Sequence, residues 1–181
     1  MGKRGVAMEF KLFSNEINDL KAFMLTNSWD YHIHKNMKEE TVQLLVEEGY
    51  YQDGRETYWI IDNDIKIGLI CIEDIEDSIV SFDLRLDATY RGQSYGHHAL
   101  RWLQNYLFGE KNKIRIEGYT RADNLSMRKC FTKAGFVKEG YLRNAWENED
   151  GSVTDSVLYS AIQSDWQNKT TTAIKLDDLA F

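Results

Sequence analysis

The sequence predicts one α/β domain over residues 1–181, in which helices cover both faces of a mixed central sheet. Its 181 residues, 43% of them hydrophobic, suffice to bury the core of one domain. Segments with the two-residue period of strands are interleaved with segments of helical period. No repeat or flexible linker divides the chain, which contains no proline. The expected order is β-α-α-β-β-β-α-β-α-β-β over residues 8–162, whereas the tail, residues 164–181, has no clear pattern.

The first part of the chain is expected to form a strand and two helices. Residues 8–13 are predicted to form the strand, and Ser14 can cap the helix that follows it. A polar and aromatic loop then covers residues 27–34. Asn36, with Glu39 three positions later, is a variant of the capping box and predicts that the second helix opens there.

A hairpin and a two-faced strand come next. Residues 57–62 and 65–73 are rich in β-formers, and Asn63-Asp64 between them tolerate the positive φ of a tight turn. In residues 80–86, apolar side chains alternate with polar ones, which is the mark of a strand whose faces differ. The polar positions are Ser81, Asp83 and Arg85.

The last part alternates helices and strands. Leucines at helical spacing predict a helix that ends at Gly109. A strand is expected over 113–120, and then a helix with Asn124 near its cap and Gly135 as its stop. Two final strands are expected at residues 136–142 and 153–162.

Charge is distributed unevenly. The net charge is −7, yet residues 85–133 hold 10 Lys/Arg against 4 Asp/Glu, and the rest of the chain holds 12 against 25. The acidic total argues against general nucleic-acid binding, while the basic stretch fits either an anionic ligand or a solvated face.

Other sequence features narrow the class of protein. No apolar run approaches the roughly 20 residues needed to cross a bilayer, and no secretory signal opens the sequence. Cys71 and Cys130 lack metal-ligand spacing, and both fall at apolar positions expected to lie in the core. We expect a cytoplasmic protein with no metal, no membrane contact and no nucleic-acid partner; a homodimer stays open.

The segment from Arg91 to Gly96 links the two-faced strand to a helix. Helix N-termini expose unpaired N–H groups that attract phosphate, glycines allow close approach, and Arg91 adds a full charge. Neither the Rossmann nor the P-loop glycine spacing is present. On its own this loop is equally compatible with a plain capped turn.

The run Arg91-Gly92-Gln93-Ser94-Tyr95-Gly96 resembles the acetyl-CoA-binding motif of GNAT acetyltransferases, usually written Arg/Gln-x-x-Gly-x-Gly/Ala. Residues 124–136 resemble the family's next helix, which Asn opens and Gly-Phe ends. Glu139-Gly140, Arg143 and Asp155 resemble the branch that acetylates ribosomal-protein N-termini and its small-amine relatives. The resemblance covers residues 79–162 clearly and the earlier chain only in its order of elements.

The resemblance implies a GNAT-like fold and acetyl-CoA as co-substrate. It implies that the backbone of Leu84, Arg85 and Leu86 pairs with the pantetheine arm. It implies that the N–H groups of Arg91, Gly92, Gln93, Ser94, Tyr95 and Gly96 hold the pyrophosphate, and that Asn124 contacts the cofactor further along. Ser94 replaces the motif's middle glycine. Phe131, expected beside the cofactor, replaces a tyrosine that protonates the leaving thiolate in many members, so that role is not carried over.

The expected activity is direct transfer of an acetyl group to a primary amine, carried by a small molecule or a protein N-terminus. Asp83 and Glu117 are candidate bases, and Ser126 and Tyr95 are candidate proton donors. Trp29, Tyr31 and His32 fall where the family places its acceptor-binding segment; each of these side chains is also compatible with ordinary packing or a surface position. The alternative function is an acyl-CoA-binding module without turnover. A nucleotide-dependent oxidoreductase is disfavoured by the glycine spacing.

Overall fold

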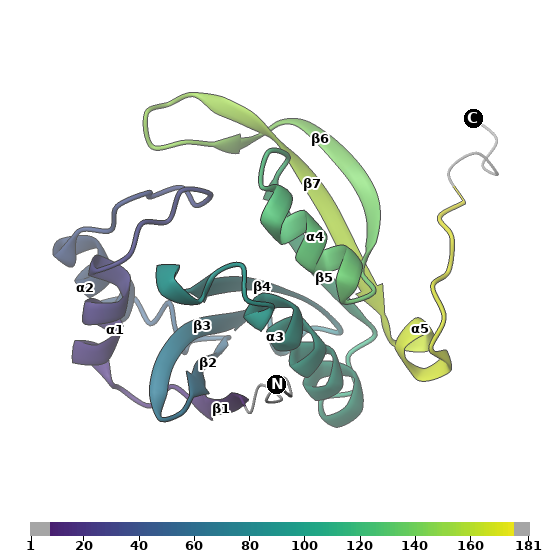
Figure 1. Ribbon diagram of the computed structural model, residues 1–181, viewed down its shortest axis with the longest axis horizontal. Helices are drawn as coiled ribbons and strands as arrows, with labels where there is room; N and C mark the ends of the chain where they lie inside the picture. Colours follow the sequence, from purple (N-terminus) through teal and green to yellow (C-terminus); the bar gives the residue numbers. More distant parts are fainter. Residues whose placement is uncertain (1–7, 176–181) are drawn as a thin grey trace, which may run out of the picture.

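The structure is a computed structural model that describes residues 8–175 (Figure 1). Its element order is the predicted one, with a short helix added at the end. The elements are β1 (Met8–Leu12), α1 (Ile17–Leu25), α2 (Glu39–Glu47), β2 (Glu56–Asp62), β3 (Ile65–Glu73), β4 (Ile79–Leu86), η1 (Ala88–Tyr90), α3 (Tyr95–Gln104), the π-helical turn η2 (Asn105–Glu110), β5 (Arg115–Arg121), α4 (Leu125–Lys133), β6 (Val137–Glu147), β7 (Val153–Ile162) and α5 (Gln163–Asn168). Residues 1–7 and 176–181, including the end of the tail, lie outside the described residues.

The strands form one seven-stranded mixed sheet in the order β1-β2-β3-β4-β5-β7-β6. All neighbours are antiparallel except β4 and β5, which run parallel. These two central strands share only two register pairs, Ile79 with Arg115 and Val80 with Ile116. Beyond these pairs the strands diverge, as Figure 1 shows, so the inner edge of β4 has no strand partner among the described residues.

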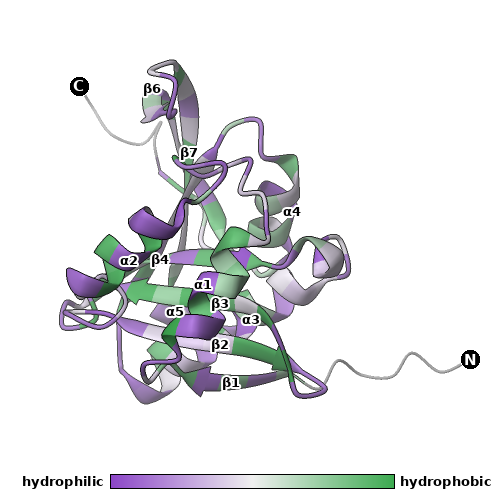
Figure 2. Ribbon diagram, turned by 90° about the vertical axis from the view of Figure 1, so that its left-hand side faces the viewer, coloured by the Kyte–Doolittle hydropathy of each residue, from purple (hydrophilic) through white to green (hydrophobic). Residues whose placement is uncertain are grey.

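Helices cover both faces of the sheet, as predicted. On one face, α1 and α2 pack over β2 and β3 around the buried side chains of Leu20, Val42, Trp59 and Leu69. On the other face, α3 and α4 pack over a core that includes Leu100 and Phe131. In Figure 2 β3 is coloured hydrophobic along most of its length, in keeping with a central strand that is buried from both sides.

Several local predictions are confirmed. Asn63 and Asp64 turn the β2–β3 hairpin with φ of 48° and 64°. The Asn124 side chain caps α4 by accepting a hydrogen bond from the Met127 N–H at 3.1 Å. Gly135, with φ of 85°, follows the end of the same helix in the left-handed conformation expected of a stop.

Two predicted caps are wrong. Helix α1 begins after Glu16 rather than Ser14, whose backbone N–H instead donates to the Glu16 carboxylate at 2.8 Å. Helix α2 opens after Lys38, and within residues 8–175 neither helix has a side-chain cap hydrogen bond. The polar signal at Asn36 therefore belongs to the loop. The α3 region also runs past Gly109, to Glu110, because a π-helical turn extends it.

In the described residues, no helix is both long enough and apolar enough to span a membrane.

Candidate active site

A cleft of about 350 Å³ opens where β4 and β5 diverge. Its lining comes from both faces of the sheet: the start of α3 and one side of α4 on one face, and the loop after α1 on the other. The last residues of β4 lie between them. The sequence-predicted residues in this lining are Trp29, Tyr31, His32, Leu84, Arg85, Leu86, Arg91, Gly92, Ser94, Gly96, Asn124 and Ser126.

The loop before α3 leaves its backbone donors free. Gly92 and Ser94 have φ of 76° and 72°, a left-handed conformation that favours glycine. No hydrogen bond joins the N–H groups of residues 92–96 to another described residue. A Cβ on Gly96 would lie 3.2 Å from the Cys130 sulfur, so glycine keeps this wall open. Unpaired N–H groups at a helix start suit a phosphate.

Arg91 holds this loop in place. Its guanidinium donates to the backbone carbonyl oxygens of Leu86 at 2.9 Å and Ser28 at 2.8 Å. It also lies 5.2 Å from the centre of the Trp29 ring, a cation–π distance. Arg91 therefore joins the end of β4 to the loop after α1, and it contributes positive charge to the cleft as well.

Helix α4 forms the opposite wall. Its Asn124 cap also donates to the Thr120 hydroxyl at 3.1 Å. Four lining residues of this helix were not predicted as site residues: Met127, Lys129, Cys130 and Lys133. Ser126, Lys129, Cys130 and Lys133 follow the helical i, i+3, i+4, i+7 spacing, which could have identified this face from the sequence. Cys130 is half-buried in the cleft wall rather than part of the core, in contrast to the fully enclosed Cys71.

On the opposite face, His32 approaches the β4 carboxylate. Its Nδ1 lies 3.4 Å from Asp83 Oδ1, and Arg85 Nε donates to Asp83 Oδ2 at 2.7 Å. Burial opposes ionisation of Asp83, but Arg85 and His32 hold its pKa below the usual value. Burial lowers the pKa of His32 to about 4; Asp83 opposes this shift, and Arg85 and Arg91 add to it. The imidazole is therefore neutral at pH 7.

Glu117 lies on the same polar face, on β5. It accepts hydrogen bonds from Arg115 at 2.8 Å and from the Tyr119 hydroxyl at 2.9 Å. Arg115 also forms a bidentate ion pair with Glu139 on β6. Both Glu117 oxygens are thus engaged, and neither Glu117 nor Asp83 belongs to the lining of the cleft.

Three predicted residues point elsewhere. The Phe131 ring is fully buried and stacks on Tyr159 with 4.8 Å between ring centres, outside the cleft lining. The Tyr95 hydroxyl donates to Asp62 at 2.6 Å, and the Gln93 side chain donates to the Thr89 carbonyl oxygen at 2.5 Å. The sequence predicted that Phe131 lies on a helix and that Gln93 and Tyr95 lie in the segment that opens α3, but it did not fix the direction of each side chain.

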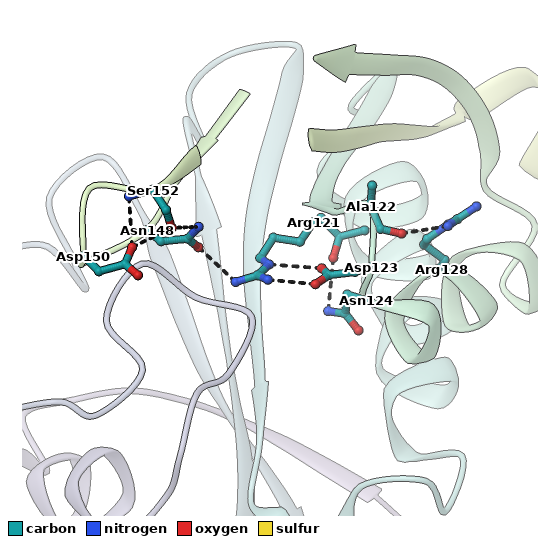
Figure 3. A network of polar contacts seen from close by, with 9 residues as sticks. Arg121, Ala122, Asp123, Asn124, Arg128, Asn148, Asp150 and Ser152 are labelled. Atoms are coloured by element: carbon teal, nitrogen blue, oxygen red, sulfur yellow. Dashed lines mark hydrogen bonds and ion pairs between the residues drawn. The ribbon is translucent and has the colours of Figure 1, made fainter. Parts of the chain in front are cut away.

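The outer end of β5 is tied to the β6–β7 hairpin, as Figure 3 shows. Arg121 forms two hydrogen bonds with the Asp123 carboxylate, at 3.0 and 2.7 Å, and a third with Asn148 at 2.9 Å. Its guanidinium also lies 5.6 Å from the centre of the Tyr31 ring. Arg121 therefore joins the hairpin, β5 and the loop after α1.

In the part of the chain that the structure describes, no group of three or more His, Cys, Asp or Glu side chains could hold a metal ion.

The fold is shared with solved acetyltransferase structures. Spermidine N-acetyltransferase from Vibrio cholerae, in complex with CoA and spermine, has a TM-score of 0.74 and 15% identity over 89% of this chain and 98% of that one. A dodecameric structure of spermidine N-acetyltransferase from the same organism has a TM-score of 0.72 and 15% identity, covering 90% and 97%. A putative acetyltransferase has a TM-score of 0.75 and 20% identity, covering 92% and 91%. None of the curated proteins matches the sequence at a significant level.

A match to a protein-family model agrees with this fold, and the matched residues include the loop before α3. The model described as "Acetyltransferase (GNAT) domain" matches residues 11–137, more than half of the chain. It covers the start of α3 and all of α4, the two walls of the cleft. The chain therefore belongs to the GNAT acetyltransferase family, and it is an acetyltransferase that uses acetyl-CoA as its co-substrate.

Proposed function

We propose that this chain transfers the acetyl group of acetyl-CoA to a primary amine, by direct transfer while both substrates are bound. One observation carries the proposal: the cleft between β4 and β5 is lined from both faces of the sheet. Two substrates that enter from opposite faces can meet there, at the diverging strands. No enzyme nucleophile is needed for such a transfer, because the thioester supplies the activated acetyl group.

The phosphate side of the co-substrate fits the start of α3. The free N–H groups of residues 92–96 and the ammonium groups of Lys129 and Lys133 give this end of the cleft positive charge. The described strands leave β4 without a partner on this side at Leu84–Leu86, so its backbone can pair with an amide-containing arm in the manner of an added strand, although the Leu86 carbonyl oxygen already accepts a hydrogen bond from Arg91. Asn124, at the start of α4, stays a prediction as a cofactor contact.

The acceptor side is formed by the loop after α1 and the polar face of β4 and β5. Trp29, Tyr31 and His32 line the cleft there, and the Asp83 carboxylate lies behind His32. Aromatic rings and carboxylates attract cationic ligands, and an amine with a pKa near 10 is a cation at neutral pH. Several of the similar structures are spermidine N-acetyltransferases, which makes spermidine the first acceptor to try.

A panel assay tests the proposal. Acetyl-CoA would be incubated with the protein and with spermidine, phenethylamine or a short peptide that has a free N-terminus, and the products identified by mass spectrometry. An acetylated amine supports the proposal and identifies its acceptor class. Acetylation of the peptide alone would favour the ribosomal-protein N-terminal branch. CoA binding without transfer to any amine would favour the alternative, an acyl-CoA-binding module.

Self-association stays a prediction. One of the similar structures, a spermidine N-acetyltransferase, is dodecameric, and light scattering of this chain with and without CoA would test for a homodimer or a larger assembly.

A further inference from the structure

We propose that His32 takes up the proton that the acceptor amine loses, and that Asp83 is the positioning residue that orients its imidazole. The inference rests on the proposed function and adds a specific proton carrier to it. Its basis is geometric: His32 lines the cleft, whereas Asp83 lies behind it with Oδ1 at 3.4 Å from Nδ1. Because Nδ1 is directed at the carboxylate, the other ring nitrogen, Nε2, is free to face the cleft.

Both members of the pair are held in place. The His32 backbone N–H donates to the Trp29 carbonyl oxygen at 2.9 Å, and the imidazole lies edge-on to the Trp29 ring, at 6.0 Å between ring centres and 88° between planes. Asp83 is fixed from the other side by Arg85, at 2.7 Å. A contact of 3.4 Å is long for a hydrogen bond, as is common in sites without substrate.

The carboxylate selects one tautomer of the imidazole. An ionised Asp83 can only accept, so it favours the His32 form that carries hydrogen on Nδ1. That form has its lone pair on Nε2. No side-chain hydrogen bond of His32 to another described residue competes for this lone pair. Nε2 is therefore able to accept a proton inside the cleft.

Burial is the main reason that His32 is neutral, and three charged groups around it modify this effect. Asp83 and Arg85 face it from β4, and Arg91 faces it from the loop before α3. Burial, with smaller contributions from the two arginines, lowers the pKa of His32 more than the carboxylate raises it, so the imidazole is unprotonated at pH 7. A weak base cannot deprotonate a free alkylammonium ion efficiently. It can take a proton from the much more acidic nitrogen that forms as the amine bonds to a carbonyl carbon.

His32 is the only proton carrier that this transfer of the acetyl group requires. The ammonium form of the acceptor first releases one proton to bulk water. The nitrogen of the neutral amine then forms a bond to the acetyl carbon while the carbonyl π electrons move to oxygen, and one of the nitrogen's remaining protons moves to His32 Nε2. The C–S bond then breaks, and its electron pair leaves on sulfur. The proton passes from the imidazolium to that sulfur, directly or through water. The products are the amide and the CoA thiol, and His32 returns to its neutral state.

Other candidate carriers are less suitably placed. Both oxygens of Glu117 accept hydrogen bonds, from Arg115 and Tyr119, and its side chain does not line the cleft. Asp83 itself is screened from the cleft and engaged by Arg85. His97 lines the cleft on the α3 side, beside the loop proposed to bind phosphate, and away from the loop that carries His32.

The test compares H32Q with H34Q, using acetyl-CoA and spermidine or the panel amine that reacts fastest. His34 is a matched control, since it belongs to the same loop and lies 3.8 Å from a carboxylate, Glu149, but is half exposed. We expect H32Q to lower kcat roughly 100-fold or more, which is within the range expected when a general base is removed. The affinity for CoA, measured by calorimetry, should be unchanged. H34Q should retain the wild-type kcat.

Two further readouts separate a proton carrier from a structural residue. Added imidazole should restore part of the kcat of H32A, which a purely structural loss would not allow. In D83N, ¹⁵N NMR of the His32 ring should show loss of the Nδ1–H tautomer, and H32Q/D83N should be no slower than H32Q alone. A wild-type kcat in H32Q would overturn this inference alone. Absence of transfer by the wild type to any panel amine would overturn the proposed function and this inference together.

Discussion

Gly118 on β5 and Phe131 on α4 are in such close contact that glycine is required at position 118. A Cβ built on Gly118 would lie 2.4 Å from both Cε1 and Cζ of the Phe131 ring, far inside van der Waals contact. The ring has no exposed surface and stacks on Tyr159 from β7. Helix α4, one wall of the cleft, is therefore seated on the sheet where β5 has no side chain.

This contact makes G118A a test of the packing. The added methyl group has no space unless Phe131 moves, so we expect the free energy of unfolding to fall by about 1–3 kcal/mol. The smaller F131L side chain should recover part of this loss in the double variant. Denaturant unfolding measures both effects. The matched control is G140A on β6, where the nearest atom to a Cβ would be 3.6 Å away and little change is expected.

The elements could be predicted because their signals are local. The Asn63-Asp64 turn, the Asn124 cap and the Gly135 stop each act within a few residues, and all three are confirmed. The caps at Ser14 and Asn36 failed because polar residues also occur in loops, where no helix follows directly. The need for glycine at position 118 could not be predicted, since it arises from a helix packed across the sheet.

The site was predictable where it is continuous in sequence. The loop at residues 91–96 and the end of β4 lie together because one follows the other along the chain. The contact of Arg91 with the Ser28 carbonyl oxygen and the approach of His32 to Asp83 join residues far apart in sequence, and no periodicity reports such pairs. The buried position of Phe131 likewise depends on how α4 is rotated against the sheet.

We expect G96V to weaken CoA binding. Position 96 faces α4 across the cleft, and even a Cβ there would lie 3.2 Å from the Cys130 sulfur, so valine would fill the space above the free N–H groups. A fall in affinity of roughly tenfold, or 1.4 kcal/mol, should be seen by calorimetry. G109A, whose Cβ would lie 3.4 Å from Trp166 and away from the cleft, should bind CoA as the wild type does. Unchanged affinity in G96V would contradict the assignment of this wall.

Ser94 offers a gain in stability. Its φ of 72° costs an ordinary residue about 1–2 kcal/mol, whereas glycine adopts this conformation freely. Glycine also gives the unfolded chain more conformational freedom, which offsets part of this gain. S94G should therefore raise the free energy of unfolding by about 0.5–1 kcal/mol. CoA affinity should persist, because the backbone N–H remains. S94A keeps the strain and serves as the control; equal stability of S94G and S94A would show that the left-handed turn is not strained.

The buried imidazole of His32 predicts how stability depends on pH. In the unfolded chain it takes up a proton near pH 6.5, whereas in the folded protein burial, Arg85 and Arg91 outweigh Asp83 and lower its pKa to about 4. Between these values the unfolded state binds more protons, so the free energy of unfolding is highest above pH 6.5 and falls as the pH drops towards 4. The pKa difference sets an upper limit of about 3 kcal/mol on this loss, and partial exposure of the side chain reduces it.

H32Q has no such proton to bind, so its stability should fall less over this interval, while H34Q should follow the wild type. Urea unfolding at several pH values measures the three curves, and coincident slopes for H32Q and the wild type would show that His32 is not the buried neutral imidazole described here.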